Sequence, residues 1–345
     1  MGTLRARLAL VVATVFACSA AGTTSHSENT GSATNSRTAP LFDFHSNFWV
    51  NLHQTLFHEA LLSESLLSAG KPDRRLQSDT PLAASGMSDA EKKAWDAAVT
   101  FYANTFAERR ELFDDDMVRV NKQLASLPDN ATDSSAAGLP PALAAVLQSA
   151  APVYAKYWWP AHDKSNKDWV ASQAANVKTL GPTVAAAMEK DLQQAWPAAA
   201  LRVDVCYYVP EIGHAYTTDD PPHTTFSSSA ATVSGLNGFE TLFHEASHSF
   251  ADTMTDALFK ECGIEKKNCG DLWHAILFYT AGVEVHRALP PADQASFTPY
   301  AYKYGLYERG DYPKYRRVLE TDWQKYLDGK IDFANAIHAL VADLQ

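Results

Sequence analysis

The sequence predicts a mainly α-helical protein with one small mixed β-sheet, an α+β fold. Through residues 41–200, apolar side chains recur at spacings of three and four, which is the period of an amphipathic helix. The pattern changes at Leu201–Val209, where every second residue is apolar, as is typical of a strand. Apolar helical patterns then return towards the C-terminus. We therefore expect a helical region at 41–200 and an α+β region at 201–345.

The first 40 residues are expected to lie outside this fold. Two arginines precede a short apolar run, Leu8–Ala17, and small residues follow, which predicts a signal peptide over residues 1–21. Two outcomes fit it: cleavage near its end, or attachment of a lipid at Cys18, where the sequence VFAC resembles a bacterial lipobox. Residues 22–40 are rich in Ser, Thr, Asn and Gly and predict a disordered linker. The protein is thus expected to be exported: periplasmic, lipid-anchored or secreted.

Several helices separated by turn signals are expected within residues 41–200. The clearest helical periods cover Ala90–Leu112, Met117–Leu127 and Pro182–Trp196. Clusters of Gly, Pro, Asp and Asn at 70–72, 128–130 and 138–141 mark breaks.

Further elements follow the first strand. The segment 223–233 is rich in Ser and Thr and predicts an edge strand. Asn237, with Glu240 three residues later, predicts the capped start of a helix whose apolar stripe continues to Met254. Two more helices are expected at Leu272–Leu289 and Phe333–Leu344.

Charge and cysteine content restrict the partners and the chemistry. A net charge of −11 argues against nucleic acid or an anionic membrane surface as a partner, because phosphate would be repelled. The spacing of Cys262 and Cys269 suits a small disulfide loop in an exported protein. Cys206 lies in an apolar alternation and is expected to be a buried free thiol. Because the cysteines are not closely paired, a cysteine-based metal site is not expected.

The hexapeptide TLFHEA occurs twice, and the second copy continues as a metal-binding motif. It reads on to give His244-Glu245-Ala246-Ser247-His248, which is H-E-x-x-H. On a helix, the two imidazoles project from one face and can hold one ion, while Glu245 reaches a water bound to it.

The first copy lacks the second ligand. Leu62 stands where the second histidine would be, and His53 and His58 lie apart around a helix. We expect a packing helix here, with His45, His53 or His58 at most lining a cleft from outside. Its buried stripe is expected to be Trp49, Leu52, Leu56 and Ala60.

A catalytic zinc ion typically has three protein ligands, so a third must come from elsewhere in the chain. The extended motif H-E-x-x-H-x-x-G-x-x-H is absent after His248. In the next apolar helix, Glu284 is favoured because an unpaired charge in an apolar run would be costly. Alternatively, Glu284 pairs with Arg287, and His274 is the ligand or a donor to substrate. His286 points away from the face of Glu284.

The sequence HEASH, with a glutamate on the next helix, resembles the gluzincin metallopeptidases, whose catalytic core is thermolysin-like. The resemblance implies zinc (Zn²⁺) bound by His244, His248 and Glu284, with Glu245 as the general base and a peptide or protein as substrate. It also implies a zincin-like lobe, in which the segment 223–233 is the sheet edge that pairs with an extended peptide.

The resemblance covers roughly residues 201–289 and has departures. Glu284 lies 36 residues after His248, and Gly282-Val283-Glu284-Val285 replaces the family sequence N-E-x-x-S-D. Asp252 follows His248 by four residues, as in the thermolysin-like motif. The helical region 41–200 resembles no family that we can name.

The expected reaction is hydrolysis of a peptide bond by a zinc-activated water, from which Glu245 takes a proton. A second donor should stabilise the developing oxyanion. The candidates are His274, Tyr300, Tyr302, Tyr304 and Tyr307. Two other functions remain open: an exported, non-enzymatic binding or scaffold lipoprotein with a helical interaction surface, and an inactive peptidase homologue that still binds zinc.

Overall fold

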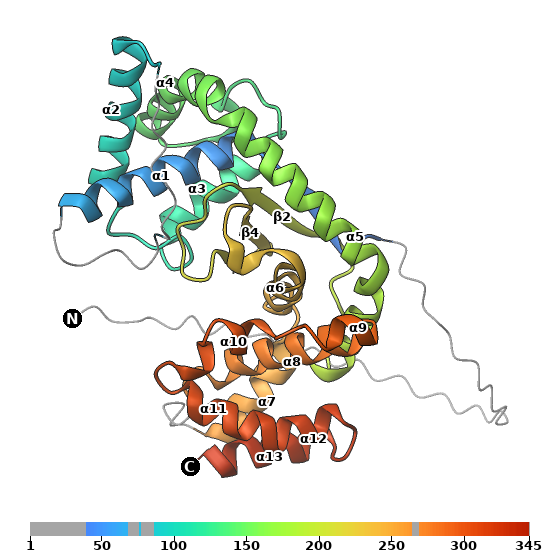
Figure 1. Cartoon of the computed structure of the whole chain (residues 1–345). Coiled ribbons are helices and arrows are strands. Elements are labelled where there is room, and N and C mark those ends of the chain that lie inside the picture. Colours follow the sequence, from blue (N-terminus) through green and yellow to red (C-terminus); the bar gives the residue numbers. More distant parts are fainter. Residues whose placement is uncertain (1–38, 68–75, 77–85, 264–268, 345) are drawn as a thin grey trace, which may run out of the picture. The chain divides into compact units, whose positions relative to one another are not determined.

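A computed structural model describes residues 39–67, 76, 86–263 and 269–344 (Figure 1). Four strands form one sheet in the order β1-β2-β4-β3. The strands are β1 (Phe42–His45), β2 (Leu201–Cys206), β3 (Ala215–Thr218) and β4 (His223–Ser227). The first three in this order are parallel, and β3 is antiparallel to β4. The prediction of a mainly helical protein with a small mixed sheet is therefore confirmed.

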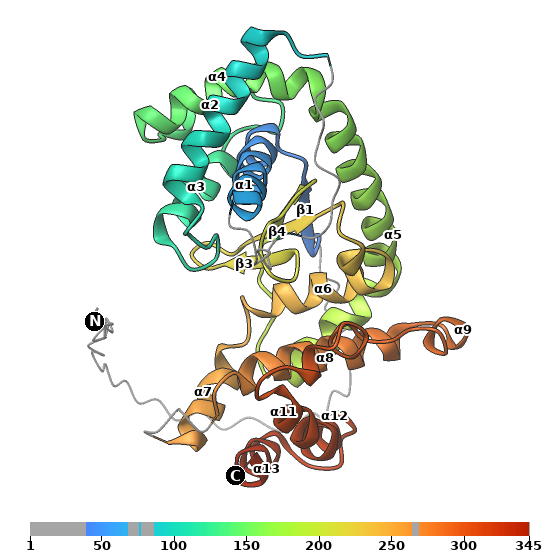
Figure 2. The ribbon, with the colours of Figure 1, turned by 60° about the vertical axis from the view of Figure 1, so that its left-hand side comes forward.

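The helices of the N-terminal half form a lobe on one face of the sheet (Figure 2). They are α1 (Phe48–Leu67), α2 (Asp89–Phe106), α3 (Asp115–Ala125) and α4 (Pro141–Tyr157). The predicted stripe of α1 is confirmed, because Trp49, Leu52, Leu56 and Ala60 are fully buried in the core of this lobe. A long helix, α5 (Trp159–Asp191), leads from the lobe to the C-terminal half.

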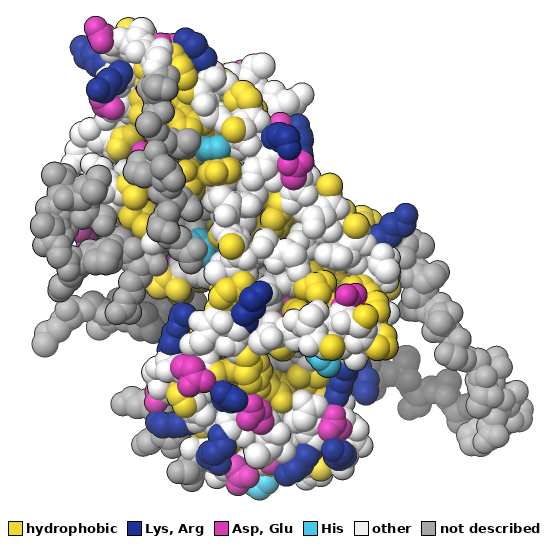
Figure 3. Space-filling model, viewed as in Figure 1, with side chains coloured by type: hydrophobic (Ala, Val, Ile, Leu, Met, Phe, Trp, Pro, Cys, Tyr) yellow, Lys and Arg dark blue, Asp and Glu magenta, His cyan; other side chains and the backbone are white. Residues whose placement is uncertain are grey.

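The helices of the C-terminal half lie on the opposite side of the sheet, where α6 packs against the strands and the others lie beyond it (Figure 2). They are α6 (Gly235–Ser247), α7 (Asp252–Cys262), α8 (Leu272–Ala288), α9 (Pro291–Gln294), α10 (Tyr300–Lys303), α11 (Tyr312–Val318), α12 (Gln324–Leu327) and α13 (Phe333–Leu344). On the surface over α11, α12 and α13, positively and negatively charged side chains lie next to one another (Figure 3). Among the described helices, none is both long and apolar enough to cross a bilayer.

Three predicted helices have wrong boundaries. The helix expected over Ala90–Leu112 is α2, which ends at Phe106. The helix predicted over Pro182–Trp196 does not start at Pro182, which lies inside α5, and it ends with α5 at Asp191. The helix predicted to begin at Asn237 begins at Gly235, and it ends at Ser247 instead of continuing to Met254. After Ser247, the backbone N–H groups bond to the carbonyl three residues earlier, and a new helix, α7, then begins. Phe250 and Met254 are nevertheless buried in the core.

The predicted strands also differ in extent and position. The strand expected over Leu201–Val209 ends at Cys206. The segment 223–233 contributes a strand only up to Ser227, and this strand is internal. Its neighbour β3 is the strand at this edge of the sheet, and the sequence pattern does not predict this short strand.

The sheet joins the two regions that the sequence divides at residue 200. Strand β1 pairs in parallel with β2, so that Phe42 lies opposite Leu201. Residues 39–345 form one unit. The predicted signal peptide and most of the linker lie outside the described residues.

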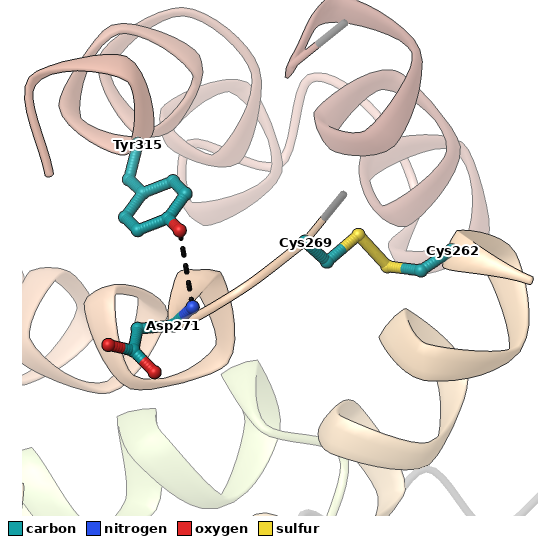
Figure 4. The surroundings of a disulfide bond; sticks show 4 residues. All are labelled: Cys262, Cys269, Asp271 and Tyr315. Atoms are coloured by element: carbon teal, nitrogen blue, oxygen red, sulfur yellow. Dashed lines mark hydrogen bonds between the residues drawn. A yellow bond between two sulfur atoms is a disulfide. The ribbon is translucent and has the colours of Figure 1, made fainter. Parts of the chain in front are cut away.

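The predicted disulfide between Cys262 and Cys269 is present, and Cys206 is a buried free thiol. The bond links the end of α7 to the segment just before α8 (Figure 4). In the same segment, the backbone N–H of Asp271 donates to the hydroxyl of Tyr315 at 3.2 Å. Together, these two contacts fix the start of α8.

Three histidines of the N-terminal lobe, His53, His58 and His162, are buried. Burial lowers the pKa of His53 and His58 to about 4 and that of His162 to about 3. A histidine with a lowered folded-state pKa contributes stability that is complete above its unfolded pKa of about 6.5 and is lost as the pH falls towards the folded pKa.

Replacing His162 by glutamine should therefore reduce the loss of stability in acid. Between pH 7.5 and pH 4.5, wild type should lose about 2–3 kcal/mol more of its unfolding free energy than this variant, because wild type must also keep the imidazole of His162 neutral. Urea unfolding at both pH values measures the difference. Equal acid dependence of His162→Gln and wild type would contradict the prediction.

Candidate metal centre

Three histidine side chains from two helices converge on one point. His244 and His248 lie one turn apart at the C-terminal end of α6, and His274 lies in the first turn of α8. Their candidate ligand nitrogens are all within 4.8 Å of one another. The imidazole ring centroids are 5.1–5.2 Å apart. Three imidazoles at these separations could hold one metal ion, whose identity the arrangement alone does not determine.

A close approach of α8 to α6 brings the third histidine to the pair. At Gly282 on α8, a Cβ atom would lie 2.9 Å from the Pro299 Cβ and 3.0 Å from the Glu240 Oε1. Because a larger residue would push these neighbours away, glycine at this position allows the two helices to pack closely. His274 thereby lies beside the end of α6.

Burial keeps the three imidazoles in the neutral form that binds metal. It lowers the pKa of His244 far below its usual range, that of His248 to about 3 and that of His274 to about 4. His244 is buried and its Nδ1 has no hydrogen-bond partner among the described residues. The other two rings are partly exposed. A neutral, closely spaced donor set with an unpaired buried nitrogen and an open side fits a resident cation.

Aromatic neighbours hold the rings in place. Phe278 stacks on the ring of His244, with centroids 3.5 Å apart and planes 16° apart. The hydroxyl of Tyr312 lies 3.2 Å from the Nδ1 of His274. Because this contact occupies Nδ1, it leaves Nε2 of His274 for a metal, as second-shell partners of metal ligands usually do.

Glu245 is the residue after His244 on α6, and one of its carboxylate oxygens is held from the sheet. The hydroxyl of Thr217, on β3, donates to its Oε2 at 2.8 Å. Burial raises the pKa of Glu245 to about 7, and the bond from Thr217 acts in the opposite direction. A carboxyl group with a pKa near neutrality is suited to both take and release a proton.

Glu284, expected as the third ligand, is not part of this group. Its Oε1 accepts a hydrogen bond from Arg287 at 2.6 Å, which is the alternative that the sequence left open. Its charge also raises the pKa of Asp191, although burial of Asp191 is the larger cause. Glu284 follows His274 by ten residues, which is about 15 Å along a helix axis. The group that could hold a metal ion thus contains His274, and Glu284 as a ligand stays a prediction that this group does not include.

Of the four tyrosines that are candidate oxyanion donors, Tyr300 is the one placed next to the site. Its ring stacks with Phe278 at 5.8 Å, and the charge of Glu245 contributes to its raised pKa of about 12, after burial. Tyr302 donates to Glu320, and Tyr307 is buried in the core of the C-terminal half. The hydroxyl of Tyr304 is directed to the carbonyl oxygen of Ala231 at 3.5 Å.

Four other residues that the sequence pattern singled out lie away from the three histidines: His45, His53, His58 and Asp252. Asp252 is exposed at the start of α7. His53 and His58 are buried within the N-terminal lobe, where His58 stacks on Tyr208. His45 lines a separate cleft in that lobe.

Three residues that the structure adds to the site were not predicted: Thr217, Phe278 and Tyr312. None belongs to a motif with characteristic spacing. The sequence signal for Phe278 and Tyr312 was only that of apolar or aromatic packing, and Thr217 is one of several threonines near the sheet edge.

Comparison of the chain with protein-family models, with curated proteins and with solved structures gives no match. The chemistry of this centre is therefore argued from its own residues.

Proposed function

We propose that the protein is a zinc-dependent peptidase. The observation that carries this proposal is a set of three closely spaced, neutral imidazoles, of which His244 is followed directly on α6 by Glu245. Zinc is the favoured ion because it prefers nitrogen ligands, and a catalytic site leaves one position open. The H-E-x-x-H motif is shared with the gluzincins, whereas the third ligand here is a histidine instead of a glutamate.

A zinc ion held by these residues would acidify a water molecule and polarise the scissile carbonyl. Glu245 then acts as the general base: its free oxygen takes the proton as the water oxygen forms a bond to the carbonyl carbon. When the carbon–nitrogen bond breaks, Glu245 gives this proton to the leaving amine.

Tyr300 is the best-placed donor to the developing oxyanion. Its high pKa keeps the phenol protonated at neutral pH, so that the hydroxyl can donate. Its position is fixed from α6, because its backbone N–H donates to the Oε2 of Glu240 at 2.7 Å.

The substrate class follows from the strand next to the base. Strand β3 is at the edge of the sheet and packs against α6. An extended peptide can add to such an edge by backbone hydrogen bonds, which presents its carbonyl groups to the adjacent site. We propose peptides or proteins as substrates, outside the cytoplasm, and with a membrane tether if Cys18 is lipidated.

The alternative of a non-enzymatic binding or scaffold lipoprotein has one observation in its favour. The N-terminal lobe has a cleft of about 760 Å³ between α4, α5 and the end of β1, lined among others by Phe48, Ala151, Trp159 and Val170. Its volume is within the range of small-molecule sites. An inactive zinc-binding homologue is a third possibility, against which the intact Glu245 argues.

Removing the metal tests the proposal. The purified protein should contain about one zinc ion per chain, and it should cleave members of a quenched-fluorescence peptide library. A zinc chelator should abolish cleavage, and added zinc should restore it, because the open coordination position is needed for hydrolysis. Metal analysis and fluorescence measure the two properties. Cleavage that survives complete removal of metal, or a zinc-loaded protein that cleaves no peptide, would contradict the proposal.

A further inference from the structure

Thr217 connects the edge of the sheet to the base through one hydroxyl group. On β3 it lies opposite Thr224 of β4, and the two side-chain oxygens are 2.9 Å apart. Its hydroxyl lies 2.8 Å from the Oε2 of Glu245 and 3.1 Å from the backbone oxygen of Glu245. Both threonines are buried.

The number of protons sets the direction of these bonds. A hydroxyl has one proton to donate and two lone pairs that accept. Two oxygens of Glu245 face Thr217: the backbone oxygen and Oε2 of the carboxylate. Neither has a proton when the carboxylate is charged, so the Thr217 hydroxyl must donate to Glu245. The contact with Thr224 is then satisfied if Thr224 donates to Thr217. The two hydroxyls thus form a short chain that ends at Oε2 of Glu245.

The two oxygens of Glu245 consequently have different surroundings. Oε2 is held by Thr217, whereas Oε1 has no hydrogen-bond partner among the described residues. Since both threonines belong to paired strands, the sheet fixes the position of the hydroxyl that holds Oε2. A hydrogen bond from a rigid element keeps a catalytic group in its productive orientation.

We propose that Thr217 is a positioning residue for the hydrolytic reaction, with Oε1 of Glu245 as the oxygen that exchanges the proton. This inference rests on the proposed function. To the proposed function it adds the carboxylate oxygen that takes the proton and the residue that orients this carboxylate. It also explains why the edge strand that binds substrate holds the base.

Replacing Thr217 by valine tests the role, because valine has nearly the same shape, is well suited to a strand and lacks the hydroxyl. The kcat for the best-cleaved library peptide should fall by about 10–100-fold, as expected when a catalytic group loses its alignment. KM and zinc content should remain within about twofold of wild type, and Thr217→Ser should restore most of kcat because it returns the hydroxyl. Thr218→Val, one residue along the same strand, removes a hydroxyl that bonds to His223 and not to Glu245, so it is the matched control for the position of the carboxylate.

A second measurement is independent of activity. In a crystal structure of the metal-free Thr217→Val variant, the carboxylate of Glu245 should have turned from its position in wild type, whereas Thr218→Val should leave it in place. An unchanged kcat or an unmoved carboxylate in Thr217→Val would overturn this inference. In that case, hydrolysis by wild type would still uphold the proposed function. If wild type itself hydrolyses no peptide, the proposed function fails, and the positioning role fails with it.

Discussion

Replacing Glu245 by glutamine should abolish most hydrolysis while the protein keeps its zinc. Glutamine has the same shape and still accepts the hydrogen bond from Thr217, but its amide cannot take the proton from water. Loss of a general base costs roughly 10²–10⁴ in rate, and we expect kcat to fall by about 10³-fold, or about 4 kcal/mol of transition-state free energy. Steady-state kinetics and zinc analysis of the same preparation measure the two effects.

The repeated hexapeptide provides the matched control for this variant. Glu59 occupies the same place in the first TLFHEA copy as Glu245 does in the second. Because Glu59 lies on α1 in the other lobe, Glu59→Gln should leave kcat unchanged. Substantial hydrolysis by Glu245→Gln would remove the assigned role. Equal losses in both variants would indicate an effect on folding instead of on chemistry.

Replacing His274 by alanine should remove zinc from the protein. Second-shell changes around a metal cost about 10–100-fold in affinity, and loss of a direct ligand should exceed this range. Competition with a chromogenic chelator measures the affinity. The expected loss follows from the convergence of three imidazoles, of which two cannot complete the coordination of a catalytic ion.

Glu284→Ala separates the two candidate third ligands. Because Glu284 bonds to Arg287 in the structure, this variant should bind zinc as wild type does and should instead lose stability. We expect about 1–2 kcal/mol, less than for a fully buried pair, since Arg287 is 37% exposed and Asp191 loses a repulsive neighbour. Unchanged zinc affinity in His274→Ala together with zinc loss in Glu284→Ala would reverse the assignment.

The part of the site that could be predicted from sequence is the part that one helix determines. His244, Glu245 and His248 lie within little more than one turn of α6, so their spacing alone places them together. The third histidine depends on how α8 packs on α6. Helical periodicity predicts which face a residue occupies, but it does not predict which level along that face meets the other helix.

The difference between the ligand predicted at Glu284 and the histidine group of the structure has a specific physical origin. The reasoning that a carboxylate in an apolar run needs a partner is correct, and the partner proved to be Arg287, one turn further along the same helix. A metal and an arginine satisfy the same electrostatic requirement, and sequence alone does not distinguish them. Thr217 was missed for a related reason: β3 is only four residues long, and its alignment with α6 is a property of the folded sheet.

The pairing of β1 with β2 also determines how the molecule must be assembled. Strand β1 leaves the ribosome early, but its partner follows only after the whole helical lobe and α5 have been synthesised. The sheet that supports Thr217 is therefore completed late, through contacts that are distant in sequence and slow to form. A gene fragment beginning at residue 201 would encode both ligand helices, yet it would leave one side of β2 unpaired and prone to aggregation.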